Sequence, residues 1–216
     1  MAQPSLDRII RAKFWVQHQL ESRVEQQLST DMEALELLRD QALKSLQASG
    51  SASDLEDLLP RFFAADIVFP RLLRSALLGS TFSLFEHSLH ALCADLGKRT
   101  ATRLTVDDLR GSGIGRAKLF LERVAGVPFP NPDPLWEDID HIRLLRNCIV
   151  HSTGHLRDRE SALGRFVRQH PSLEMDEGTG IYLKREFHTW AVGQMEAFVT
   201  RVLSHSYDGR GGDGAA

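Results

Sequence analysis

Apolar side chains recur three or four residues apart along most of this chain, a spacing that predicts helices with one buried face. The pattern is longest over residues 5–48, at Ile10, Phe14, Leu20, Val24, Leu28, Leu35, Leu38, Ala42 and Leu46. Within it, Thr30-Asp31-Met32-Glu33 fits a capping box. One long helix and a two-helix hairpin are therefore both open.

A glycine- and serine-containing segment follows this first helical region. Residues 47–52 predict a flexible joint, and a second helix is expected to start at Ser53. Pro70 favours the first turn of a longer helix, which we expect to run to about residue 96 with Gly97 closing it.

The carboxyl half begins with a proline-rich segment. Residues 127–134 contain four prolines, which remove backbone donors and constrain their neighbours, so the next helix is expected to begin near Leu135. Beyond it the pattern predicts a helix over 157–170, a small β-hairpin over 173–185, a closing helix over 186–205 and a disordered tail from residue 209.

Together these elements predict an all-α fold, an up-and-down helical bundle with a small β-hairpin before its last helix. The helices at 70–96, 135–151 and 186–205 are expected to pack together. The predicted divisions are an N-terminal helical extension over 1–66, the bundle over 67–206 and the tail over 207–216.

Composition limits the classes of protein to which the chain can belong. With 216 residues, 42% hydrophobic and 25% charged, it can bury one sizeable core as an ordinary soluble protein. The net charge of −3 gives no whole-surface attraction to nucleic acid, so an RNA site must come from a local patch.

The cysteines and the start of the chain indicate where the protein acts. Cys93 and Cys148 are the only cysteines and show no zinc-binding spacing, which favours a reduced, cytoplasmic setting. Residues 1–7 lack an apolar signal core, and the uncharged run over 75–85 is too short to cross a bilayer. We therefore expect no membrane partner.

The hexapeptide Arg146-Asn147-Cys148-Ile149-Val150-His151 is the strongest chemical signal in the sequence. Arginine stays cationic and fits a phosphate with a planar fork, and histidine exchanges a proton near neutral pH. This combination suits phosphodiester chemistry.

At about 100° per residue, the motif helix can be laid out by angle. Leu135, Ile142, Leu145 and Ile149 fall on the core side, with Arg146 at its edge and Arg143, Asn147 and His151 along the adjacent flank. An arginine beside apolar residues needs an anionic partner, and Glu86 is the candidate. Arg146 and Glu86 could equally form a plain bridge that ties two helices together.

The motif resembles the Arg-x(4–6)-His signature of HEPN domains, in which a polar residue commonly follows the arginine. The resemblance extends over roughly 69–205 and includes the glutamate-bearing stretch 75–86, residues 118–121 and 135–139, and the exit Ser152-Thr153-Gly154. It implies a HEPN-like bundle that cleaves RNA without metal or cofactor, in a site shared across a homodimer.

Several roles follow from this resemblance. His151 would act as base or acid toward the ribose 2′-OH, Arg146 would stabilise the phosphate, and Asn147 would orient the imidazole or bind a phosphate oxygen. Toxin–antitoxin or antiphage-defence roles, with a cognate inhibitor or partner protein, are common for such proteins. Some of these toxins carry a modified tyrosine two residues after the histidine, where this chain has Thr153.

Three further features have both functional and plain interpretations. Arg116, Lys118 and Arg123 belong to a basic run that could guide an RNA backbone, although a solvated basic face is the commoner meaning. The glycines of 111–115 lack the rest of a phosphate loop and are interpreted as a connector. His87 and His90 have no evident third ligand, so no metal site is predicted.

Two other functions compete with an endoribonuclease. A HEPN-like domain without catalysis would serve as an RNA-binding or dimerisation module. Alternatively, the long N-terminal helices would bind a partner, and their apolar stripe would then stay partly exposed.

Overall fold

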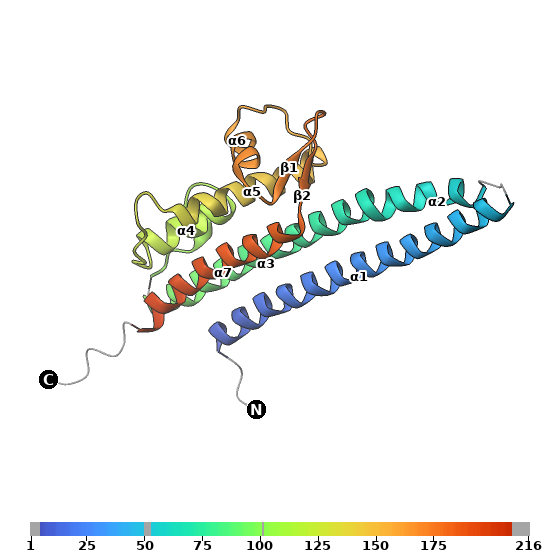
Figure 1. The fold of residues 1–216 in the computed structure, drawn as a ribbon. Helices are drawn as coiled ribbons and strands as arrows, with labels where there is room; N and C mark the ends of the chain where they lie inside the picture. Colours follow the sequence, from blue (N-terminus) through green and yellow to red (C-terminus); the bar gives the residue numbers. More distant parts are fainter. Residues whose placement is uncertain (1–4, 50–52, 101, 209–216) are drawn as a thin grey trace.

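The computed structural model describes residues 5–49, 53–100 and 102–208, and these are mostly helical (Figure 1). In chain order the elements are α1 (Leu6–Ser49), α2 (Ser53–Phe63), the π-helix η1 (Ala64–Val68), α3 (Phe69–Arg99), the 3-10 helix η2 (Val106–Asp108), α4 (Gly113–Arg123), α5 (Pro134–Ser152), α6 (Ala162–Gln169), β1 (Leu173–Met175), β2 (Ile181–Leu183) and α7 (Arg185–Asp208). The all-α fold is confirmed, as is the small hairpin before the last helix. The predicted tail over 207–216 starts too early, because α7 continues to Asp208, and residues 209–216 lie outside the described residues.

The N-terminal region is one helix of 44 residues, α1. Thr30 does not cap a second helix, because its hydroxyl donates to the carbonyl of Gln26 inside α1 (3.0 Å). Helix α1 runs beside α2, η1 and α3, which form one continuous helical rod from Ser53 to Arg99 (Figure 1). This rod passes through the predicted division between residues 66 and 67 without interruption.

Gly97 does not end α3, which corrects the sequence prediction. The helix continues to Arg99, and Gly97 is buried against α4. A Cβ atom at this position would lie 3.3 Å from the ring of Phe120. The glycine therefore permits close packing of two helices and does not terminate one of them.

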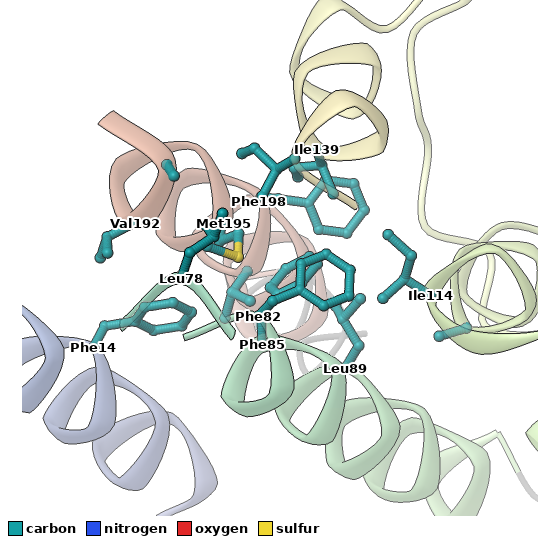
Figure 2. Close-up of a cluster of buried hydrophobic side chains, with 14 of the residues drawn as sticks. Phe14, Leu78, Phe82, Phe85, Leu89, Ile114, Ile139, Val192, Met195 and Phe198 are labelled. Atoms are coloured by element: carbon teal, nitrogen blue, oxygen red, sulfur yellow. The ribbon is translucent and has the colours of Figure 1, made fainter. Parts of the chain in front are cut away.

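The core lies where α3 and α7 meet the other helices, as Figure 2 shows. Phe85 of α3 and Phe198 of α7 are fully buried, with ring centroids 6.1 Å apart and an edge-to-face angle of 79°. Buried residues from α1, α4 and α5 complete the cluster, among them Phe14, Ile114 and Ile139. The predicted packing of the helices at 70–96, 135–151 and 186–205 is confirmed.

The inner face of α1 is apolar at both ends and polar in the middle. Ile10 and Phe14 are buried near its start, Gln17, Glu21 and Glu25 follow, and Leu28, Leu35 and Ala42 return to the apolar pattern. Leu20 and Leu38, which the sequence placed on the buried face, are exposed. For Leu20 the prediction was wrong because the facing helices offer polar partners to Gln17, Glu21 and Glu25, which apolar periodicity does not reveal.

We call these buried polar contacts the polar seam. Thr81 donates to Gln17 Oε1 (2.9 Å) and lies 2.8 Å from His188 Nε2, while His188 Nδ1 lies 3.4 Å from Glu21. One turn further along α1, Arg74 donates to both carboxylate oxygens of Glu25, at 2.7 and 2.8 Å. The seam thus joins α1, α3 and α7 through hydrogen bonds and ion pairs.

Beyond the seam, residues 32–49 of α1 together with α2 and η1 form an arm that extends past the rest of the molecule (Figure 1). Its own core is small and consists of Leu35, Ala42, Leu58 and Ala65, with Met32 and Phe62 packed against it. The rest of the molecule, here called the body, contains the main core.

Helix α5, which carries the motif, is fixed at its first residue. Pro134 follows Asp133, a buried residue whose two carboxylate oxygens accept hydrogen bonds from Arg201 at 3.1 and 2.8 Å. Ile142 and Leu145 are fully buried as predicted. Helix α6 spans only Ala162–Gln169 of the predicted 157–170.

No helix in the described part of the chain is both long and apolar enough to cross a membrane.

Candidate functional site

A pocket of about 420 Å³ opens between α3, the start of α4 and α5. Its polar wall comes from Glu86 of α3 and from Asp140, Arg143, Arg146 and Asn147 of α5. The other wall residues are Phe82, Ser112, Gly113, Ile114, Gly115 and Trp136. Four residues predicted from the sequence therefore meet in one pocket.

Arg146 is held in this pocket with part of its hydrogen-bonding capacity unused. Its Nη1 donates to the side-chain oxygen of Asn147 (3.2 Å), and its guanidinium carbon lies 6.0 Å from the ring centroid of Phe82. Its Nε is buried without an acceptor among the described residues. A buried donor without a partner costs about 1–3 kcal/mol, so a shift of the side chain that brought Nε against an acceptor would be favourable.

Glu86 lines the same pocket but is not the partner of Arg146. Among the described residues, no cationic side chain lies within 4.0 Å of its carboxylate. Instead Oε1 lies beside the first residue of α4, 2.9 Å from where a Cβ of Gly113 would be. The expected Glu86–Arg146 ion pair is therefore absent, because Glu86 lies toward α4.

The formal charges in the pocket balance. Arg143 and Arg146 contribute +2, and Glu86 and Asp140 contribute −2. Arg143 is already paired, since its Nε donates to Asp140 at 2.7 Å. Attraction of an anion must therefore come from specific donors and not from net charge.

The start of α4 supplies such donors. Ser112 is the residue before the helix, and its side chain makes no capping hydrogen bond. Gly113, Ile114 and Gly115, the first residues of α4, line the pocket. The first backbone N–H groups of a helix have no partner inside it and favour anions. The glycine segment predicted as a connector is thus a wall of the pocket.

His151 lies apart from the pocket, at the exposed carboxyl end of α5. It follows Asn147 by one helical turn, about 6 Å along the helix axis. Just beyond it, Thr153 has a left-handed backbone (φ 50°), which ends the helix. Within one chain, the predicted catalytic histidine and arginine therefore do not share one pocket.

The three predicted RNA-binding residues lie along α4 with different surroundings. Arg116 donates to the carbonyl of Gly111 at 3.0 and 2.7 Å and to Asp107 at 3.0 Å. The ammonium of Lys118 lies 4.8 Å from the centroid of a Trp136 ring. Arg123 is exposed, with Glu122 at 3.8 Å. Arg123 is the most accessible of the three to an RNA backbone.

Other chemistries find less support in the described residues. No group of three or more His, Cys, Asp or Glu side chains there could hold a metal ion. Burial raises the pKa of the Cys148 thiol, which contacts the carbonyl of His155 at 3.4 Å. A thiolate nucleophile at Cys148 is therefore disfavoured.

Sequence reasoning missed Asp140 and Trp136 as wall residues. Asp140 lies three residues before Arg143, a spacing that pairs side chains on a helix and could have identified it. The position of Trp136 beside Lys118 depends on how α4 lies relative to α5, and helix periodicity holds no signal for that.

Comparisons with protein-family models, curated proteins and solved structures gave no match for this chain.

Proposed function

We propose that the protein is a metal-independent endoribonuclease of the HEPN type that acts as a toxin or antiphage-defence effector. The unpaired Nε of Arg146, in a pocket that also exposes the start of α4, is the observation that carries this proposal. Both groups are donors, and a phosphodiester supplies the matching acceptor oxygens.

In the proposed reaction, a phosphate of the RNA occupies the pocket and accepts hydrogen bonds from Arg146 and the first turn of α4. A histidine takes the proton of the neighbouring ribose 2′-OH, and that oxygen attacks phosphorus. The 5′-oxygen leaves with a proton from a second acid, so that a 2′,3′-cyclic phosphate and a 5′-hydroxyl are formed.

The position of His151 makes a second copy of the chain part of this proposal. Since His151 lies outside the pocket of its own chain, one RNA strand would have to run along α5 to meet both groups. Two His151 side chains across a two-fold axis would supply both base and acid. The active form would then be a homodimer with the α5 ends near its axis.

The first test is cleavage of RNA by purified protein in EDTA. Wild-type protein should leave 2′,3′-cyclic phosphate ends and should spare DNA, which has no 2′-OH. His151→Ala should lower the rate by about 10²–10⁴-fold, the usual contribution of proton transfer. Arg146→Ala should also lose activity, with only a small change in stability because it removes one hydrogen bond to Asn147 and no ion pair.

His87→Ala is the matched control, since His87 is also an exposed helical histidine but lies on α3, away from the carboxyl end of α5. It should cleave like the wild type. If wild-type and His151→Ala protein cleave RNA at the same rate, the activity comes from a contaminating nuclease and the proposal is wrong.

A non-catalytic HEPN-like RNA-binding or dimerisation module is the second candidate. The exposure of His151 favours it, because a catalytic histidine is usually held within reach of the reacting atoms. In this case RNA would bind without being cut, and Arg123→Ala would weaken binding more than His151→Ala.

A further inference from the structure

The arm and the first turn of α3 carry a row of exposed apolar side chains that no described part of the chain covers. We call Leu59, Phe63, Ile67 and Leu72 the arm stripe; their exposed fractions are 68%, 59%, 40% and 61%. Single exposed apolar residues are ordinary on a protein surface, but a contiguous row indicates a contact surface.

The π-helix η1 brings this row onto one face. Leu72 follows Phe63 by nine residues, which in a regular α-helix would turn it about 180° away. The i→i+5 turn of η1 contains one extra residue, which reduces the angle between Phe63 and Leu72 around the helix axis by about 100°. Both side chains therefore line the same groove. π turns occur frequently at functional sites, and this one creates the continuous stripe.

The stripe leads into a groove of about 600 Å³ between the arm and the body. Ile149, Thr153 and Tyr182 form its body side. Arg71 lies in its wall, donates to the carbonyl of Thr153 at 3.0 Å and lies 4.8 Å from the Tyr182 ring centroid. Figure 1 shows the arm extending past the hairpin of β1 and β2, so that arm and body form an L.

The charges along this face complement one another when two copies run antiparallel. Glu56 is exposed and lies three residues before Leu59 and seven before Phe63, on the same side of α2. Arg71 lies eight residues after Phe63 and has N–H groups beyond those bonded within the chain. A two-fold axis beside Phe63 therefore sets Glu56 of each copy opposite Arg71 of the other.

We propose that the arm stripe and its groove bind a second copy of this chain, with the two arms antiparallel. Each groove binds the part of the other arm that carries Glu56 and Leu59. The two apolar stripes then cover each other, and two Glu56–Arg71 ion pairs form between the copies. This is an isologous interface, in which the same surface serves on both copies.

This interface differs from the dimer of the proposed nuclease. Because Arg71 of one copy lies opposite Glu56 of the other, the two Arg71 side chains are separated by the 15 residues between Glu56 and Arg71, or about 22 Å along the helix axis. Each Arg71 is also bonded to Thr153 of its own chain. The two His151 ends therefore do not meet in one cleft here. The proposed arm dimer does not depend on RNA cleavage. Whether a variant of the arm stripe cleaves RNA tests the proposed nuclease activity and not the arm dimer.

The test is the molar mass in solution by light scattering at increasing protein concentration. Phe63→Glu places a charge in the middle of the stripe and should halve the mass relative to wild type. Leu37→Glu is the matched control, because Leu37 is equally exposed on α1 of the same arm but lies outside the stripe. It should keep the wild-type mass.

Charge reversal supplies a second test that does not depend on apolar contacts. Glu56→Lys and Arg71→Glu should each lower the mass, and the double variant should restore it because the pairs are rebuilt with opposite signs. Equal masses for wild type and Phe63→Glu would overturn the proposal, as would a double variant that stays dissociated. A wild type that is monomeric throughout would also overturn it and would favour a helix of another protein as the occupant.

Discussion

At the scale of single residues, Gly113 is the most constrained position in the candidate site. It begins α4 with a left-handed backbone, φ 52°, a conformation that is sterically unfavourable for any residue with a Cβ atom. A Cβ there would also lie 2.9 Å from the carboxylate of Glu86. Both constraints act in one place, so the shape of the pocket depends on this glycine.

Replacing Gly113 with Ala should destabilise the protein by about 1–2 kcal/mol, the cost of a left-handed backbone for a residue with a Cβ. Gly115→Ala is the control, because Gly115 lines the same pocket with nothing within 4 Å of its Cβ position. It should be neutral or gain about 0.5–1 kcal/mol in helix stability. Chemical denaturation measures both, and equal stability of the two variants would contradict the assigned strain.

At the scale of elements, α1 shows how far the sequence could predict this fold. Its periodicity correctly predicted a helix, and Ile10 and Phe14 are buried as expected. It could not predict burial of Glu21 and Glu25, because their partners lie on α7 and α3, far away in the chain. Whether a polar residue on α1 is buried depends on contacts with other helices, and the pattern of a single sequence does not reveal those contacts.

The same reason limits what could be predicted of the candidate site. The angular layout of α5 set Arg146 next to the flank of Arg143 and Asn147, and these three side chains line one pocket. The Glu86–Arg146 pair required the relative rotation of two helices, and that expectation was wrong. The role of residues 112–115 depends on where α4 packs, which no local pattern reveals.

The polar seam should make stability depend on pH. Burial alone would raise the pKa of Glu21, but hydrogen bonds from His188 and Thr189 and the charges of His188 and His18 outweigh it, so this pKa is lowered. A lowered folded-state pKa adds stability that is complete above the ordinary glutamate value of about 4.3. That stability is lost as the pH falls through the folded-state value.

Urea denaturation between neutral and acidic pH tests this expectation. Glu21→Gln should cost about 1–3 kcal/mol at neutral pH, because His188 loses its buried partner. The difference between wild type and variant should shrink as the pH falls below about 4. Glu33→Gln, on an exposed part of the same helix, is the control. A constant difference at all pH values would contradict the role of Glu21.

At the scale of the whole molecule, the body and the arm are stabilised in different ways. The body has a large apolar core around Phe85 and Phe198, whereas the arm buries only a few side chains between two helices. Two helices alone bury little surface, and pairing with a second copy would cover the exposed side of the arm. Arm and body are thus expected to differ in their resistance to local opening.

The length of α1 has a hydrodynamic consequence. Its 44 residues extend about 66 Å, whereas a compact chain of 216 residues has a radius of gyration near 17 Å. Small-angle X-ray scattering of the Phe63→Glu variant, at a concentration where light scattering gives the mass of a single chain, should therefore give a radius of gyration clearly above about 17 Å and a skewed pair-distance distribution. A symmetric distribution with a value near 17 Å would mean that the arm folds back on the body in solution.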